Sequence, residues 1–169
     1  MEHSVIDSYA TALPVLFTCL RYSSGDILEF GGGLYSTPLI HAFAIGGRYA
    51  RTVENDPIWA QFLATIICKV SNTVSHELWA TDYGVTPVDD HRWGVVFIDH
   101  VADRRALEIE RVRPYADLII AHDTDDAGYC MEPILSTFPY RFDYKGLTPH
   151  TTVVSDKISL EWLSDNLLL

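Results

Sequence analysis

Aspartate and histidine stand side by side after two apolar runs of the chain. Asp99-His100 follows Val96-Phe97-Ile98, and His122-Asp123 follows Ile119-Ile120-Ala121. Such runs are typical of buried parallel strands, whose carboxyl ends meet at the edge of the sheet where ligands bind. Imidazole and carboxylate groups there can relay protons near neutral pH or hold a divalent cation. We therefore expect Asp99, His122 and Asp123 to lie together in a catalytic site.

The histidine of the second run, His122, has two interpretations that the sequence leaves open. A histidine has an unperturbed pKa of about 6.5, which suits a general base. A histidine at a strand end can equally hold the loop that follows it. Another histidine, His41, is expected on the surface of a helix.

A run of glycines supplies a second candidate site. Gly31, Gly32 and Gly33 follow a predicted strand that ends at Glu29-Phe30, and they precede a predicted helix. The first strand-to-helix turn of a nucleotide-binding α/β domain needs glycines, because the backbone N–H groups must approach the ligand. The G-x-G-x-x-G spacing of dinucleotide enzymes is not met, since Ser36 stands at the third position. The run alone fits either a nucleotide site or a simple tight turn.

Two acids at the ends of the next two predicted strands favour the nucleotide site. Glu54, followed by Asn55, lies at roughly the 20-residue spacing expected of a carboxylate that binds ribose hydroxyls. Asp82 could accept a hydrogen bond from an adenine amino group, and Tyr83 could flank the adenine ring. Each acid alone could be an ordinary surface residue, but together with the glycines they predict a bound nucleotide.

Short β-branched and aromatic runs alternate with longer amphipathic stretches, which indicates βαβ units around a parallel sheet. The predicted strands are 27–30, 49–54, 77–81, 94–98, 118–121, 140–144 and 151–155, and the predicted helices are 37–44, 57–70, 102–113 and 131–138. Only 145–150 separates the last two strands, too short for a helical crossover, so these strands should be antiparallel. We expect one domain over 1–169, with an N-terminal helix within 1–24 and an α/β core over 25–169.

The glycine turn and the two acids resemble the class I S-adenosylmethionine-dependent methyltransferases. Glu29-x-Gly31-x-Gly33 matches the E-x-G-x-G turn of that family, and the resemblance covers nearly all the chain after residue 24. It implies an α/β, three-layer Rossmann-like fold whose seven-stranded, mostly parallel sheet ends in a C-terminal antiparallel hairpin. It also implies S-adenosylmethionine as cofactor, with ribose at Glu54 and adenine at Asp82. The implied cofactor site is made of Glu29, Gly31, Gly32, Gly33, Glu54, Asn55, Asp82, Tyr83 and Asp99.

The end of the fourth predicted strand is similar to the catechol O-methyltransferase branch, in which an aspartate at this place ligates magnesium. The resemblance implies a metal site of Asp99, His122 and Asp123. In catechol-type enzymes the ligands after the fifth strand read Asp-Asn, whereas this chain continues from His122-Asp123 to Thr124, as in a broader group of small methyltransferases that need not bind metal. Magnesium prefers oxygen ligands, so His122 shifts the preference towards manganese, iron or zinc, or abolishes binding. A divalent metal is therefore the less favoured expectation.

The composition restricts the partners and the compartment. Twenty-three acidic and 12 basic residues give a formal charge of −11, which repels nucleic acids and anionic membranes. The apolar stretch 10–20 is too short to span a membrane, and Pro14 interrupts it, so we expect a helix packed on the domain. The three cysteines are widely spaced and suggest neither a disulfide framework nor a thiolate zinc site. We expect a cytoplasmic protein that does not bind nucleic acid or membrane.

The leading hypothesis is an enzyme that transfers a methyl group from S-adenosylmethionine to an unidentified oxygen or nitrogen acceptor, on a small molecule or a protein. Tyr35 and Tyr129 are expected to contact this acceptor, because they follow the first and fifth strands. The alternative is a catalytically inactive cofactor-binding or scaffold protein with the same fold. A nicotinamide-dependent oxidoreductase is disfavoured by the incomplete glycine pattern and the final hairpin. Assembly as a homo-oligomer stays open.

Overall fold

The computed structural model describes residues 8–67 and 75–167. Seven strands in this part of the chain form one sheet in the order β3-β2-β1-β4-β5-β7-β6. They are β1 (Asp26–Phe30), β2 (Ala50–Glu54), β3 (His76–Ala80), β4 (Trp93–Ile98), β5 (Ala116–His122), β6 (Tyr140–Tyr144) and β7 (Thr151–Ser155). The apolar alternation therefore located every strand to within two residues at either end.

The pairing of the strands confirms the predicted sheet. Strands β1 to β5 pair in parallel, whereas β7 runs antiparallel to both β5 and β6. The short link between β6 and β7 allows only this hairpin, because a parallel pair needs a crossover of a dozen or more residues. The strand order reverses between β1 and β4, and an open α/β sheet binds its ligands at such a reversal.

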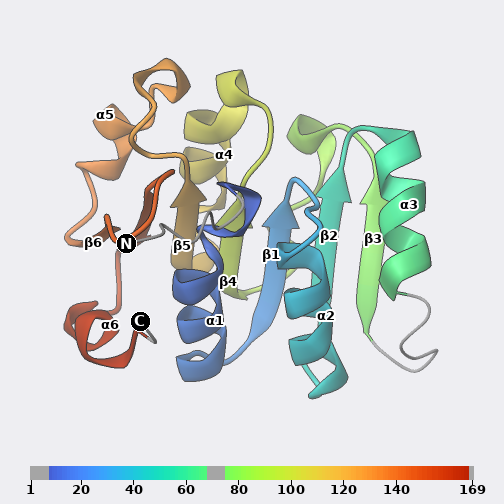
Figure 1. The fold of residues 1–169 in the computed structure, drawn as a ribbon, viewed down its shortest axis with the longest axis horizontal. Helices are drawn as coiled ribbons and strands as arrows, with labels where there is room; N and C mark the ends of the chain where they lie inside the picture. Colours follow the sequence, from blue (N-terminus) through green and yellow to red (C-terminus); the bar gives the residue numbers. More distant parts are fainter. Residues whose placement is uncertain (1–7, 68–74, 168–169) are drawn as a thin grey trace, which may run out of the picture.

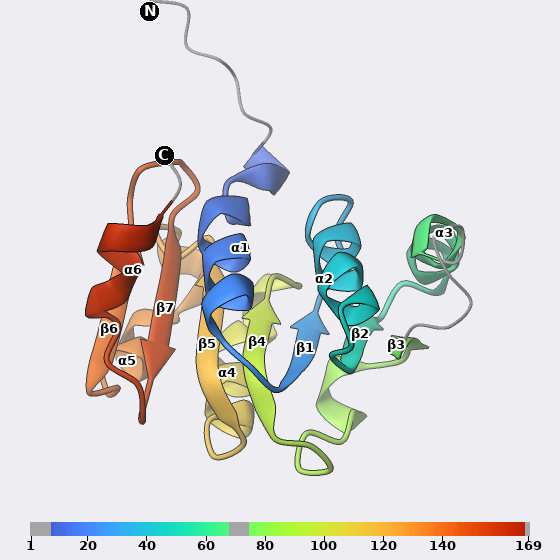
Figure 2. The ribbon, with the colours of Figure 1, turned by 90° about the horizontal axis from the view of Figure 1, so that it is seen from below.

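Helices cover both faces of the sheet, which gives three layers. The helices are α1 (Leu13–Tyr22), α2 (Ser36–Ile45), α3 (Pro57–Ile67), α4 (Arg105–Val112), α5 (Glu132–Leu135) and α6 (Glu161–Asn166). Figures 1 and 2 show α1, α2, α3 and α6 on one face and α4 and α5 on the other. The sheet and its helices thus form the predicted α/β, Rossmann-like arrangement.

Side chains that alternate along the central strands make two cores. On the face of α1 and α2, Ile27, Val95 and Phe97 are buried with residues of α1 and α6. On the opposite face, Leu28 and Val96 are buried with residues of α4 and α5. A strand buried on both faces reads as a continuous apolar run, which is why β4 and β5 were so clear in the sequence.

Helices α1, α4 and α5 differ from their predicted bounds. Helix α4 begins at Arg105 rather than at residue 102, because Ala102–Arg104 forms a 3₁₀ turn. Helix α1 begins at Leu13 rather than at residue 10, because Pro14 is tolerated only in a first turn. Helix α5 spans only Glu132–Leu135 instead of 131–138, because Thr137 and Phe138 close 3₁₀-type turns and Pro139 disfavours a helical residue before it. The predicted helix 57–70 is confirmed from Pro57, with Asp56 as its cap, to Ile67; its end lies outside the described residues.

One helix, α6, was not predicted. Its apolar positions, Trp162 and Leu163, are too few to set a period in six residues, so no clear helical pattern marks this segment. Leu163 is buried against the core beside α1, and the Trp162 ring lies 5.8 Å from the ring of Tyr22. Tertiary contacts with α1 therefore stabilise this helix more than its own propensity does.

Candidate active site

A cavity of about 610 Å³ opens at the carboxyl ends of β1, β4 and β5. The described residues that line it are Ser8, Tyr9, Gly31, Gly32, Gly33, Leu34, Ser36, Trp59, Asp99, His100, Arg105, His122, Asp123, Tyr129 and Pro149. Because this is the edge at which the strand order reverses, the cavity lies where the fold is expected to bind a ligand. It brings together the glycine turn and the aspartate–histidine pairs that the sequence singled out.

The glycine turn lies close to the ends of the neighbouring strands. Gly31 has a φ of +89°, and a Cβ atom on it would lie 2.2 Å from the backbone oxygen of Asp99. The N–H groups of Gly32 and Gly33 donate to the carboxylate of Glu54 and the hydroxyl of Thr37, at 3.1 and 3.0 Å. In this structure the glycines provide room and the donors of Gly32 and Gly33 hold the turn, so the contact of these N–H groups with a ligand stays a prediction.

Glu29 supports the turn from below and is fully buried. Its Oε2 accepts hydrogen bonds from the hydroxyls of Thr37 and Thr52, at 2.8 and 2.6 Å. Burial raises the pKa of Glu29 to about 7, although these hydroxyls oppose the shift. Since Thr37 also accepts from the N–H of Gly33, Glu29 is linked to the turn through one side chain. It lies outside the lining of the cavity among the described residues.

A histidine pair continues this buried network. His76 Nε2 lies 2.9 Å from the hydroxyl of Thr52, and the Nδ1 atoms of His76 and His41 are 3.1 Å apart. Burial lowers the pKa of His76 to about 4 and also lowers that of His41, so both rings are neutral at pH 7. The prediction of His41 on a helix surface is wrong, because the ring is buried between α2 and β3.

The two acids predicted to bind the nucleoside are occupied by contacts within the protein. Glu54 accepts hydrogen bonds from the N–H groups of Gly32 and Asp56, at 3.1 and 2.8 Å. Asp82 accepts from the N–H of Gly84 at 2.8 Å and so caps the short 3₁₀ turn after β3. Glu54 bonds to Gly32, which lines the cavity, but neither acid is itself among the described residues of the lining.

Tyr83 lies beside these acids and is buried. Its hydroxyl is 3.2 Å from Oδ1 of Asn55 and 3.4 Å from Oε1 of Glu54, and its ring stacks on His100 at 4.3 Å. Burial and the charge of Arg105 lower the pKa of His100 to about 4, so this ring is neutral at pH 7. The phenol therefore fills the space between Glu54 and His100.

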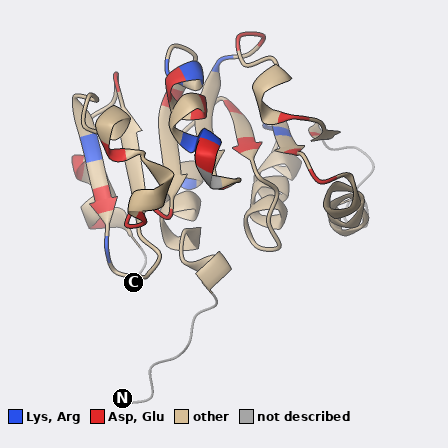
Figure 3. Cartoon of the chain, turned by 90° about the horizontal axis from the view of Figure 1, so that it is seen from above, with Lys and Arg blue, Asp and Glu red and all other residues tan. Residues whose placement is uncertain are grey.

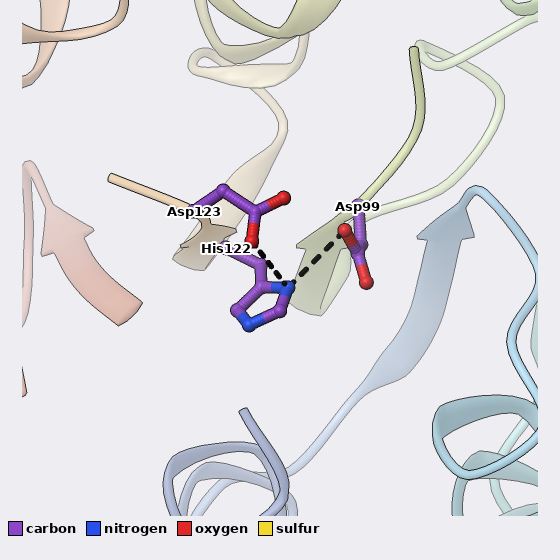
Figure 4. Close-up of side chains that lie close together, drawn as sticks. All are labelled: Asp99, His122 and Asp123. Atoms are coloured by element: carbon purple, nitrogen blue, oxygen red, sulfur yellow. Dashed lines mark ion pairs between the residues drawn. The ribbon is translucent and has the colours of Figure 1, made fainter. Parts of the chain in front are cut away.

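Asp99, His122 and Asp123 meet as predicted. Nδ1 of His122 lies 3.2 Å from Oδ1 of Asp99 and 3.4 Å from Oδ1 of Asp123 (Figure 4). One ligand atom from each residue fits within 4.8 Å of the others. Although burial alone would raise the pKa of Asp99, the neighbouring His122 ring and the charge of Arg105 hold it below the ordinary value. Asp99 is thus ionised at neutral pH.

Both nitrogens of the His122 ring face protein groups. Nδ1 points at the two carboxylates, and Nε2 lies 2.8 Å from the hydroxyl of Thr11, which precedes α1. Thr11 in turn donates to the carbonyl of Ser8, so the segment that lines the cavity at Ser8 is tied to His122. His122 thus contacts the segment before α1 through Nε2, and both interpretations of this histidine stay predictions.

The sequence reasoning missed Arg105, which is the first residue of α4. Its Nη2 donates to Oδ1 of Asp99 at 3.0 Å and its Nη1 to Oδ2 of Asp123 at 2.8 Å. Further bonds reach the carbonyls of His122 and His100, at 2.7 and 2.6 Å. Only 5% of the side chain is exposed. An arginine in a helical pattern gives no local sign of such burial. Its position in the sequence between Asp99 and Asp123 is the one feature that could have suggested this role.

The aromatic residues near the rim are partly as predicted. Tyr129 lines the cavity, and its ring centre is 4.2 Å from the guanidinium carbon of Arg105. Tyr35 precedes α2 and is not among the described residues of the lining. Trp59, near the start of α3, lines the cavity and donates from Nε1 to the carbonyl of Gly32 at 2.7 Å.

The donor set of this cluster does not fit magnesium. The Asp99 and Asp123 carboxylates that would ligate the ion already bind the guanidinium of Arg105, a permanent cation. The third side chain, His122, offers nitrogen where magnesium prefers oxygen. The two carboxylates that could hold an ion are therefore already paired with a cation of the chain.

Two broader properties accompany the site. Acidic segments outnumber basic ones over the ribbon (Figure 3), in keeping with the charge of −11. No helix among residues 8–67 and 75–167 is long and apolar enough to cross a membrane.

Comparison with known proteins identifies the fold. No family model and no curated protein matches the sequence. Among solved structures, the O-methyltransferase from Bacillus cereus in complex with SAH has a TM-score of 0.66 at 16% identity, over 92% of this chain and 84% of that chain. A candidate caffeoyl-CoA O-methyltransferase from Staphylococcus aureus has a TM-score of 0.68 at 12% identity, over 90% and 85%. The cofactor-bound Rv0187 from MTB has a TM-score of 0.62 at 16% identity, over 94% and 84%. The chain therefore has the fold of the class I methyltransferases, in the form seen in small O-methyltransferases.

Proposed function

We propose that the protein is a methyltransferase that uses S-adenosylmethionine and methylates an oxygen or nitrogen acceptor. The observation that carries the proposal is the cavity at the reversal of strand order, where Gly31 to Gly33 and Asp99 line one space. The Bacillus cereus enzyme, which shares this fold, was solved with SAH, the product that remains after the methyl group leaves.

In the proposed complex, the cofactor lies across the glycine turn. Its ribose would bind Glu54 beside Asn55, its adenine would lie near Asp82 and Tyr83, and its methionine part would face Asp99. Because Glu54 and Tyr83 now contact each other, the nucleoside would have to displace the Tyr83 hydroxyl to reach the carboxylate. Glu29 would act on the cofactor only through the turn that it supports.

The reaction would be an in-line displacement. The acceptor atom would form a bond to the methyl carbon while the carbon–sulfur bond breaks, and the acceptor would release its proton. Holding the two reacting atoms in line supplies much of the acceleration, so few residues need to take part chemically. Asp99, His122 and Asp123 would form the polar wall against which the acceptor, a small molecule or an exposed protein side chain, is placed, with Tyr129 beside them.

Calorimetric titration with S-adenosylhomocysteine and with NAD tests the cofactor. We expect one molecule of S-adenosylhomocysteine to bind per chain and NAD not to bind. Glu54→Gln should weaken S-adenosylhomocysteine about tenfold or more, because hydrogen bonds to a charged group are worth about 1.5–3 kcal/mol. Glu110→Gln, a matched change at an exposed position of α4, should leave the affinity unchanged. Binding of NAD instead, or of neither compound, would refute the proposal.

Release of S-adenosylhomocysteine from S-adenosylmethionine separates an active enzyme from the alternative, a cofactor-binding scaffold. A panel of catechol, phenol, amine and peptide acceptors should include at least one that stimulates this release. If the cofactor binds and no acceptor in the panel stimulates release, the scaffold function gains support. In an active protein, an unchanged rate and pH profile after His122→Ala would exclude His122 as the general base.

A further inference from the structure

We infer that Arg105 replaces a divalent cation in this site: its guanidinium bridges Asp99 and Asp123 and keeps metal ions from binding there. Arg105 would exclude metal ions from the protein before cofactor or acceptor binds, whatever the acceptor is. It rests on the proposed function only in its consequence, that the reaction of this chain needs no added metal.

The cluster has the composition and size of a site for one ion. Carboxylate oxygens of Asp99 and Asp123 and a nitrogen of His122 all lie within 4.8 Å of one another, at the adjacent ends of β4 and β5. Two carboxylates and one imidazole are ligands that manganese, iron or zinc accept. The separation of these side chains therefore does not prevent an ion from binding.

Arg105 already provides a cation that joins the two carboxylates. Its Nη2 binds Asp99 at 3.0 Å and its Nη1 binds Asp123 at 2.8 Å, so one cation joins the two carboxylates. The bonds from Nε and Nη1 to the carbonyls of His100 and His122 fix the guanidinium in this place. All three nitrogens of the group are engaged with acceptors, and none of the four bonds depends on a ligand.

The guanidinium and an ion would compete for the same oxygens. Arginine does not lose its proton in proteins, so its charge persists at every pH at which the protein is folded. A divalent cation between Asp99 and Asp123 would lie close to that charge, in a site where little water screens it, since 5% of the arginine side chain is exposed. Tyr129, whose ring packs over the guanidinium, limits the space into which Arg105 could withdraw.

Arg105 is accordingly a positioning residue. It ties the ends of β4 and β5 to the start of α4 and sets the distance between the carboxylates that line the cavity. A metal ion could join the same carboxylates, but it could dissociate, whereas the guanidinium belongs to the chain. The fixed guanidinium gives the cluster its geometry before any ligand arrives.

Binding of Mn²⁺ by the purified protein, followed by the electron paramagnetic resonance of the free ion, tests the inference. The wild type should show no site of order one per chain at Mn²⁺ concentrations up to about 1 mM. Arg105→Met removes the charge at similar length and should create one site that binds Mn²⁺ at least tenfold more tightly than the wild type. Adding Asp99→Asn to this variant should abolish the new site. Arg104→Met is the matched control on the neighbouring residue, which pairs with Glu108 instead, and should bind no Mn²⁺.

Arg105→Lys keeps a positive charge and should restore the exclusion of Mn²⁺, an outcome that a purely structural role for Arg105 does not require. Circular dichroism establishes that each variant is folded before titration. A wild-type site for Mn²⁺ that Asp99→Asn removes would overturn the inference, whether or not Arg105→Met folds. A folded Arg105→Met variant that binds no Mn²⁺ would also overturn it. Neither outcome bears on S-adenosylhomocysteine binding, so the proposed function is tested separately.

Discussion

At the scale of single residues, buried polar groups beneath and beside the cavity define the site more than its exposed ones. Glu29 is fully buried under the glycine turn, and Tyr83 is almost fully buried against Glu54. A buried carboxyl prefers its neutral form, so Glu29 links the stability of the turn to pH. The hydroxyl of Tyr83 contacts Glu54, the carboxylate to which the ribose of the proposed cofactor would bind. Each of these contacts leads to a separate measurable effect.

Glu29 should make the protein less stable as pH rises from about 4.5 to about 7. Its pKa is raised by burial from 4.5 to about 7, so the neutral carboxyl stabilises the folded state below pH 4.5, and this contribution is lost as pH rises through 7. Glu29→Gln cannot ionise. The unfolding free energy of the variant minus that of the wild type should therefore grow by on the order of 3 kcal/mol over this range and stay constant above it.

Urea unfolding at a series of pH values measures this difference. Taking the difference between variants removes the contributions of His76 and His100, whose lowered pKa values act in the opposite direction. Glu110→Gln, at an exposed position, is the control and should show no such trend. A difference that does not change between pH 4.5 and 7 would mean that Glu29 ionises normally in the folded protein.

Tyr83→Phe should tighten the binding of S-adenosylhomocysteine by roughly 2- to 10-fold. The variant keeps the ring that stacks on His100 but lacks the hydroxyl that contacts Glu54 and Asn55. A net hydrogen bond is worth about 0.5–1.5 kcal/mol, and the ligand would no longer have to break it. Tyr49→Phe removes a comparable hydroxyl, bonded to Glu77 away from the cavity, and should not alter the affinity. Weaker binding by Tyr83→Phe would place the hydroxyl among the groups that hold the ligand.

At the scale of elements, the turn between β1 and α2 decides whether the cavity forms. The first glycine, Gly31, is required because a side chain there would collide with backbone atoms. A side chain on the third, Gly33, would collide only with another side chain. A Cβ on Gly31 would approach the backbone of Asp99 and His100, but a Cβ on Gly33 would meet the hydroxyl of Ser36 at 2.7 Å. Two substitutions of the same size in one turn should therefore have different effects.

Gly31→Ala should destabilise the protein by about 2–4 kcal/mol, since it combines a left-handed backbone with overpacking against β4. Gly33→Ala should cost less, about 1 kcal/mol, because only the Ser36 side chain has to move, yet it should weaken S-adenosylhomocysteine by narrowing the cavity. Thermal denaturation and calorimetric titration of the two variants measure these effects. Equal losses of stability in both would contradict the geometry of the turn.

At the scale of the whole molecule, the sequence predicted the sheet far better than the contacts inside the site. The strands were found because their apolar periodicity is local and each is buried on both faces. The convergence of Asp99, His122 and Asp123 followed from topology alone. Arg105 could not be foreseen, because its role depends on the docking of α4 against two strand ends. The burial of Tyr83 and His41 and the formation of α6 likewise depend on contacts between distant segments.

Hydrogen–deuterium exchange with and without saturating S-adenosylhomocysteine tests the central claim most directly, because it reports both binding and place. We expect slower exchange in peptides that cover the turn after β1 and the ends of β2 and β4, with little change at β6 and α6. Unchanged exchange throughout the chain, or protection only at a distance from the glycine turn, would contradict a methyltransferase cofactor site in this cavity.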